Sequence, residues 1–76
     1  MVEVFVLITC EEVNEEKIIN ELSEINGIIT TNRVIGPYNI LVKIKGETID
    51  TVIETITSDI KTIDKIQYTL TLKVKH

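Results

Sequence analysis

The residue types that most often carry out chemistry are scarce in this 76-residue chain. It has one histidine, His76 at the last position, and one cysteine, Cys10. A structural zinc site takes about four histidine, cysteine or carboxylate ligands, and covalent catalysis pairs a nucleophile with a base such as histidine. We therefore expect no metal site, no cofactor and no catalytic residue, and we predict that the protein is not an enzyme.

The carboxylates do not replace the missing groups. Glu11, Glu12, Glu15 and Glu16 cluster where a helix is predicted to begin. Acidic residues in a first helical turn stabilise the positive end of the helix dipole, which explains this cluster better than acid–base catalysis. The three glycines stand apart from one another, so the sequence contains no phosphate-binding loop.

The overall charge argues against a nucleic-acid-binding surface. The formal net charge is −4, from 8 basic and 12 acidic residues, so we expect no direct DNA binding. Four lysines near the C-terminus leave a local basic patch open as an alternative to a solvated rim; they are Lys61, Lys65, Lys73 and Lys75. A single cysteine fits a reducing cytoplasm, and no apolar run reaches the roughly 18 residues of a membrane span. We therefore expect a cytoplasmic protein.

The hydrophobic pattern predicts the element order β-α-β-β-α-β. Strands are expected over residues 2–9, 28–35, 38–45 and 65–75. Asn14 is expected to cap a helix that ends at Gly27, and Thr48 to cap a second helix. The buried stripe of that second helix is expected to be Ile49, Val52, Ile53, Ile56 and Ile60. Two right-handed crossovers then give a single ferredoxin-like α+β domain over residues 1–76. In it, a four-stranded antiparallel sheet carries both helices on one face, with the first and third strands central.

Gly36 and Pro37 predict a two-residue hairpin loop between the second and third strands. Glycine adopts the positive φ that a type II′ turn needs, and proline needs no ladder hydrogen bond at the next position. One face of the third strand should meet the helices; it consists of Tyr38, Ile40, Val42 and Ile44. A slip of one residue in the hairpin register would turn that face outward instead.

The opposite face of the sheet has no helix to cover it. We expect it to carry Phe5, Leu7, Thr9, Asn39, Leu41, Gln67, Thr69 and Thr71. Its apolar centre and polar margin suit a twofold homodimer with Phe5, Leu7 and Leu41 in the interface. The 15 isoleucines and the absence of alanine also indicate oligomerisation, while a partly exposed sheet in a monomer is the alternative.

Two stretches resemble a known family of regulators. The segment Val34-Ile35-Gly36-Pro37-Tyr38-Asn39-Ile40 resembles the Gly-x-Tyr-Asp hairpin of the ligand-binding (RAM) domain of Lrp/AsnC transcription regulators. The segment Tyr68-Thr69-Leu70-Thr71-Leu72 resembles the closing Thr-x-Thr strand of that domain. Residues 4–9 and 25–28 also fit, so the resemblance covers essentially the whole chain.

The resemblance implies a stand-alone ligand-binding domain without the family's N-terminal helix-turn-helix. Domains of this family dimerise through their sheets and assemble into rings, commonly octamers, with amino-acid effectors bound between dimers. The matching positions, and hence the implied ligand-binding residues, are Gly36, Tyr38, Asn39, Thr69 and Thr71. The implied partners are further copies of the chain, an amino-acid effector and full-length Lrp/AsnC regulators.

Asn39 departs from the family pattern, which usually has aspartate at this position. A carboxylate can pair with the ammonium group of an amino acid, whereas an amide offers neutral hydrogen bonds about half as strong. The effector therefore differs, or its binding is weakened or lost. Ordinary β-propensity also accounts for Thr69 and Thr71 without any ligand.

Two other functions stay open at this point. A dimeric α/β-barrel enzyme, such as a cofactor-independent oxygenase, also pairs ferredoxin-like sheets face to face. Such enzymes generally use histidine or tryptophan in a barrel cavity, and this chain has no tryptophan and one terminal histidine. The other alternative is a purely structural oligomerisation module that binds no ligand.

Overall fold

The computed structural model describes residues 1–73. The expectations for Lys75 and His76, and the end of the predicted last strand, lie outside this range. The strands are β1 (Val2–Cys10), β2 (Ile28–Arg33), β3 (Ile40–Gly46) and β4 (Ile66–Lys73). A 3₁₀ turn, η1 (Glu12–Asn14), leads into α1 (Glu15–Leu22), and α2 (Ile49–Glu54) continues as the π-helical segment η2 (Thr55–Ile60).

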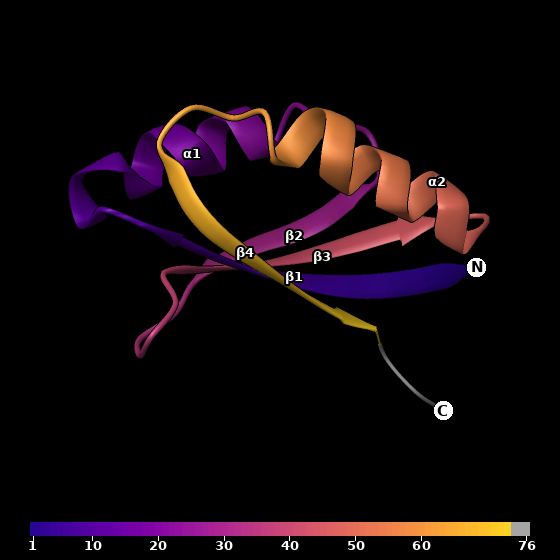
Figure 1. Cartoon of the computed structure of the whole chain (residues 1–76), viewed down its shortest axis with the longest axis horizontal. Helices are drawn as coiled ribbons and strands as arrows, with labels where there is room; N and C mark the ends of the chain where they lie inside the picture. Colours follow the sequence, from indigo (N-terminus) through magenta and orange to yellow (C-terminus); the bar gives the residue numbers. More distant parts are fainter. Residues whose placement is uncertain (74–76) are drawn as a thin grey trace.

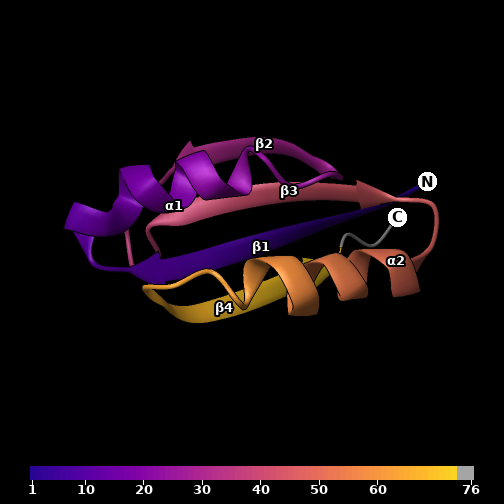
Figure 2. The same ribbon diagram turned by 90° about the horizontal axis from the view of Figure 1, so that it is seen from above.

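The strands form one antiparallel sheet in the order β2-β3-β1-β4. Both helices lie on the same face of this sheet (Figure 1). Seen from above, α1 runs along the β2–β3 side and α2 along the β4 side (Figure 2). This is the predicted ferredoxin-like α+β fold, with the first and third strands central.

The core lies between the sheet and the helices. Alternate residues of β1, namely Val4, Val6 and Ile8, are buried on the helix side. They pair with the inward residues of β3, so the predicted faces of both strands are confirmed. The other fully buried side chains of the core are Ile18, Leu22, Ile40, Val42, Ile44, Val52 and Ile60.

The two helices begin differently. The hydroxyl of Thr48 accepts a hydrogen bond of 3.2 Å from the backbone N–H of Thr51, which confirms the predicted cap of α2. Asn14 stands at the predicted N-cap position of α1, but it also ends the preceding 3₁₀ turn and its side chain makes no capping hydrogen bond. The predicted stripe of α2 is also wrong at Ile53, which is 49% exposed. It follows the buried Val52 by one residue and therefore lies about 100° around the helix.

The predicted faces of the last strand are wrong. Thr69 and Thr71 pair with the inward-facing Ile8 and Val6, so both threonines lie on the helix side of the sheet. The cause is a β-bulge between the pairs Thr9–Tyr68 and Cys10–Ile66, which leaves Gln67 as an extra residue. An extra residue shifts a strand by one position and exchanges its two faces. Tyr68, Leu70 and Leu72 therefore lie on the open face.

The predicted two-residue hairpin loop is also wrong. The β2–β3 pairing ends at Arg33 and Ile40, and the backbone N–H of Val34 donates to the carbonyl of Asn39 at 2.9 Å. Residues 34–39 form the loop, so Tyr38 and Asn39 precede β3 rather than belonging to it. Gly36 has the expected positive φ, at +136°, and Gly27 after α1 has φ of +95°.

Candidate functional site

The hairpin loop of residues 34–39 lies at the end of the sheet where β1 leads into α1 and β4 begins. The loop curls away from the helices (Figure 1). Ile35 at its tip is fully exposed, and Tyr38 is half-buried. A Cβ atom added to Gly36 would meet nothing within 4 Å, so the backbone there is open to close approach by another molecule.

Both polar atoms of the Asn39 side chain make hydrogen bonds within the chain. Its side-chain oxygen accepts a hydrogen bond of 2.9 Å from the backbone N–H of Cys10. Its side-chain nitrogen donates to Oε2 of Glu15 at 3.0 Å. Its backbone N–H donates to the carbonyl of Ile8 at 2.8 Å. The amide thus joins the end of β1 to the first turn of α1.

Sequence reasoning missed two charged residues beside Asn39. Oε1 of Glu15 lies 3.5 Å from Nε of Arg33, and the side chains of Glu15 and Arg33 are 13% and 57% exposed. Glu15 begins α1 and Arg33 ends β2, so only the folded chain brings them together. From the sequence, Glu15 is explained only as an acidic residue in a first helical turn, where it stabilises the positive end of the helix dipole. A carboxylate there has no sequence feature that marks its tertiary partners.

Cys10 lies under this charged group. Its side chain is buried, and its thiol is free. Burial raises the pKa of the Cys10 thiol, and the negative charge of Glu15 raises this pKa further. The thiol is therefore held in its neutral form, which is the opposite of what a nucleophile or a metal ligand requires.

The predicted site residues do not meet in one pocket of a single chain. Asn39 and Thr69 flank Ile8 from opposite sides of β1, which separates them by two strand spacings, or roughly 10 Å. Thr69 is half-buried and Thr71 is exposed, both on the helix side of the edge strand β4. Gly36 and Tyr38 lie in the loop on the other side of β1.

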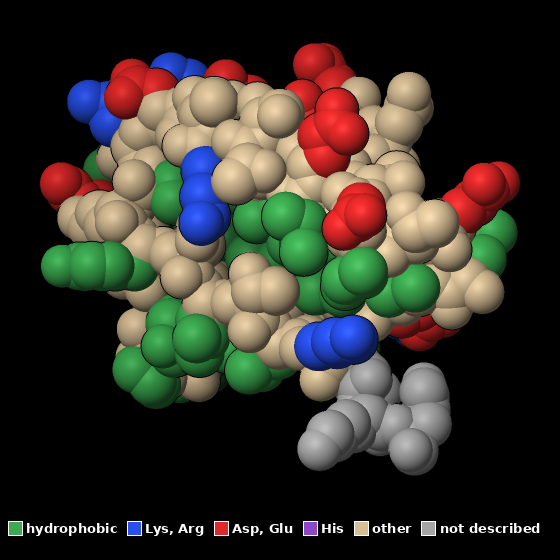
Figure 3. Space-filling view, turned by 45° about the vertical axis from the view of Figure 1, so that its right-hand side comes forward, with side chains coloured by type: hydrophobic (Ala, Val, Ile, Leu, Met, Phe, Trp, Pro, Cys, Tyr) green, Lys and Arg blue, Asp and Glu red, His purple; other side chains and the backbone are tan. Residues whose placement is uncertain are grey.

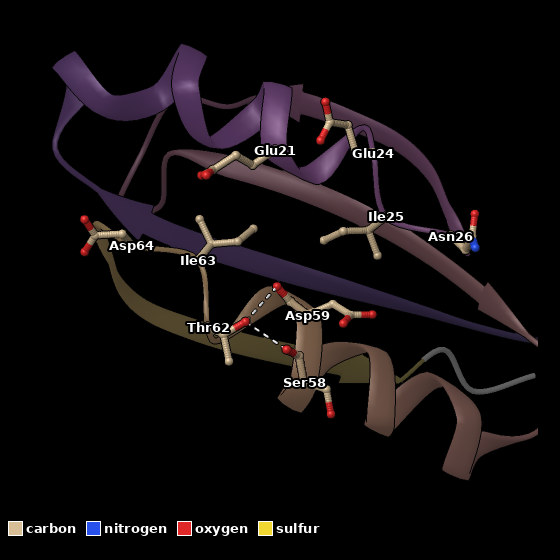
Figure 4. Close-up of a pocket in the computed structure, with 9 residues that line it drawn as sticks. All are labelled: Glu21, Glu24, Ile25, Asn26, Ser58, Asp59, Thr62, Ile63 and Asp64. Atoms are coloured by element: carbon tan, nitrogen blue, oxygen red, sulfur yellow. Dashed lines mark hydrogen bonds between the residues drawn. The ribbon is translucent and has the colours of Figure 1, made fainter.

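A groove lies elsewhere, between α1 and η2. This groove has a volume of about 700 Å³ (Figure 4). Its lining consists of Glu21, Glu24, Ile25, Asn26, Ser58, Asp59, Thr62, Ile63 and Asp64. None of these was predicted as a site residue. Four of them are carboxylates and none is basic, so the groove offers no cation to the carboxylate of an amino acid. Within residues 1–73, no group of His, Cys, Asp or Glu is arranged to hold a metal ion.

The open face of the sheet is more apolar than predicted. Because of the bulge, Tyr68, Leu70 and Leu72 join the expected Phe5, Leu7 and Leu41 there; we call these six residues the sheet-face patch. Tyr68, Leu70 and Leu72 are 73%, 41% and 45% exposed in the single chain. Figure 3 shows hydrophobic side chains over the lower part of the molecule and acidic ones gathered mostly over the helices.

A charged margin borders the sheet-face patch. Nζ of Lys43 lies 3.3 Å from Oε1 of Glu3 and 5.9 Å from the centre of the Phe5 ring. An apolar centre with a polar edge is the usual anatomy of a protein–protein interface.

Sequence comparison gives this architecture a family. The sequence profile of the Lrp/AsnC ligand-binding domain matches residues 3–75. The chain belongs to the Lrp/AsnC ligand-binding domain family. The resemblance that the hairpin and the closing strand indicated is thereby confirmed. No curated protein sequence matches this Lrp/AsnC domain significantly.

Solved structures agree with this assignment. FFRP-DM1 is 25% identical with a TM-score of 0.92, and the match covers 99% of this chain and 100% of that one. The hypothetical protein PHS023 from Pyrococcus horikoshii is 25% identical with a TM-score of 0.91, covering 100% and 92% of the two chains. E. coli AsnC is 26% identical with a TM-score of 0.91, covering 99% of this chain and 51% of AsnC. This Lrp/AsnC domain therefore spans about half the length of AsnC. None of its helices within residues 1–73 is long and apolar enough to cross a membrane.

Proposed function

We propose that this Lrp/AsnC domain is a non-enzymatic effector domain that binds an amino acid between chains and acts through its own assembly. The observation that carries the proposal is the sheet-face patch, whose Tyr68, Leu70 and Leu72 are exposed in the single chain. A patch with aromatic and leucine side chains at its centre and a Glu3–Lys43 pair at its margin suits burial against a second copy. Pairing of two such faces gives a twofold homodimer, and further contacts between dimers give a ring such as an octamer.

The effector site is proposed at the contact between such dimers, at the hairpin end of the sheet. Gly36, Tyr38, Asn39, Thr69 and Thr71 keep their proposed place around it. They do not close a pocket within one chain, which supports a site that a second chain completes. In this arrangement Gly36 allows close backbone approach, and the threonine hydroxyls supply hydrogen bonds.

The regulatory effect follows from linkage between binding and assembly. An effector changes the assembly only if its affinity differs between the assembly states, and the assembly then changes effector affinity by the same factor. Mixed assembly with full-length Lrp/AsnC regulators in the cytoplasm would change the number of DNA-binding domains in each ring. The domain itself would contact no DNA.

Calorimetric titration with each of the twenty amino acids tests the effector, followed by sizing of the protein with and without any ligand that binds. We expect heat from at least one amino acid and a shift in the assembly distribution with it. No heat from any of them would remove the amino-acid effector. Binding without any change in size would remove the link between effector and assembly.

A further inference from the structure

The Glu15–Arg33 ion pair beside the hairpin loop is better suited to bind a charged ligand than the amide of Asn39. Both polar atoms of that amide are engaged by Cys10 and Glu15 within the chain. Glu15 and Arg33 carry charges beside the loop, because Glu15 accepts from Asn39 and Arg33 directly precedes the loop residue Val34.

We propose that Glu15 and Arg33 together recognise the zwitterion of an α-amino acid, and that Asn39 is the positioning residue that holds Glu15. This proposal rests on the proposed function and names the charged residues that bind the effector. Glu15 accepts hydrogen bonds from the ammonium group, and the guanidinium of Arg33 donates to the carboxylate. Arginine suits this role because its planar donors match a carboxylate in two parallel hydrogen bonds.

The geometry of the pair leaves it free to exchange partners. The Glu15–Arg33 separation of 3.5 Å is longer than the 2.7–2.9 Å typical of a charge-assisted hydrogen bond. Arg33 is more than half exposed, and exposed ion pairs are weak because solvent screens them. When a zwitterion enters between the two groups, its ammonium pairs with Glu15 and its carboxylate pairs with Arg33, so both groups keep a partner of opposite charge.

Asn39 gives Glu15 a fixed position. Its nitrogen holds Oε2 at 3.0 Å while its oxygen is anchored on the backbone of Cys10, at the end of a central strand. Oε1 remains toward Arg33. Each carboxylate oxygen has two lone pairs, so Glu15 can keep the Asn39 hydrogen bond and still accept from an ammonium group.

The test uses the full chain, the amino acid that gives the largest heat in the titration, and two analogues of that amino acid. One analogue lacks the amino group and the other lacks the carboxylate. Glu15→Gln should lower the affinity for the amino acid and for the amine by about tenfold or more and leave the affinity for the deaminated acid unchanged. Arg33→Gln should lower the affinity for the amino acid and for the deaminated acid and leave the affinity for the amine unchanged. A structural role would shift all three ligands alike.

Glu16→Gln is the matched control, because Glu16 is an exposed carboxylate in the same helical turn. It should bind all three ligands as the unchanged chain does. Equal affinities in Glu15→Gln, Arg33→Gln and the unchanged chain would overturn this proposal and leave the proposed function standing. No binding by the unchanged chain would overturn both.

The role of Asn39 is tested by exchanging the amide and the carboxylate between positions 39 and 15. Asn39→Asp alone places a second carboxylate beside Glu15 and should lower affinity for the amino acid. The exchanged variant Asn39→Asp/Glu15→Gln restores one amide and one carboxylate and should recover part of the affinity for the amine. An exchanged variant that binds no better than Asn39→Asp would show that Asn39 does not act through Glu15.

Discussion

The two faces of the sheet differ sharply in charge. All but one of the 12 acidic residues lie in residues 11–26 and 47–64, which form the helices and their connections. The exception, Glu3, is paired with Lys43 beside the open face. Like charges oppose the approach of two helix sides, whereas the sheet-face patch has no such barrier. The distribution of charge therefore favours the sheet-face patch as the face that is buried in the proposed assembly.

The largest expected effect is on self-association, and it should differ between substitutions on the two faces. Leu70→Lys should weaken self-association by about 1,000-fold. Each copy loses apolar contact and buries an ammonium, at a cost of about 2 kcal/mol, and a twofold interface contains the change twice. Ile53→Lys is the control, because Ile53 is exposed to a similar extent on the helix side. Sedimentation equilibrium of both variants measures the effect. Equal association constants would contradict the assigned face.

A second comparison concerns the folding of the single chain. Leu22, the last residue of α1, is fully buried, so Leu22→Ala should lower the free energy of unfolding by about 3 kcal/mol. Leu72→Ala on the open face should lower it by less than about 1 kcal/mol in dilute protein, and by more as the protein concentration rises. Urea denaturation at two concentrations distinguishes the variants. A concentration-independent loss in Leu72→Ala would argue against burial between copies.

The starts of the two helices give a smaller contrast. Thr48→Ala removes the capping hydrogen bond of α2 and should cost about 1 kcal/mol of stability. Asn14→Ala removes no capping hydrogen bond and should change stability by less than half as much. Thermal unfolding by circular dichroism compares them. An equal loss in both variants would mean that Asn14 stabilises α1 in a way that the side-chain contacts do not show.

The smallest expected effect concerns the acidic groove between α1 and η2. Glu24→Gln/Asp59→Asn removes like charges from its two walls and should raise stability by a few tenths of a kcal/mol at low salt. Glu3→Gln on the sheet side breaks an ion pair and should lower stability by a few tenths of a kcal/mol at low salt. Thermal unfolding at 20 mM and 500 mM salt should show both differences shrinking at the higher concentration. A stability loss in the groove variant would contradict repulsion across it.

Much of the fold could be predicted from the sequence because regular alternation and local capping specify it. The apolar positions of β1 and β3 recur with period two, and both strands are buried as the pattern predicts. Thr48 stands directly before a helical apolar stripe, and its cap needs only residues three positions apart. Such features are local, so the sequence contains all of the information that they require.

The last strand shows where this reasoning fails. Ile66 does face the helices, but the bulge at Gln67 exchanges the faces of every later residue. A bulge depends on how β4 pairs with β1, which neighbouring residues in the sequence do not reveal. The sheet-face patch was therefore predicted with threonines where the folded chain has leucines.

The contacts of the candidate site residues could not be predicted for a related reason. Asn39 reads as a free polar residue in a turn, yet its partners Cys10 and Glu15 lie 29 and 24 positions away in the sequence. The Glu15–Arg33 pair likewise joins a helix to an edge strand. Hydrogen bonds between residues so far apart in the sequence follow from the topology of the sheet, and no spacing motif predicts them.

Sedimentation velocity of the unchanged chain over a range of micromolar concentrations tests the central claim, assembly through the open face, most directly. We predict species of at least twice the monomer mass of 8.6 kDa, with a distribution that shifts toward the monomer on dilution. A single monomeric species at every concentration would contradict the account. The sheet-face patch would then be an exposed surface, and the proposed effector site would lack its second chain.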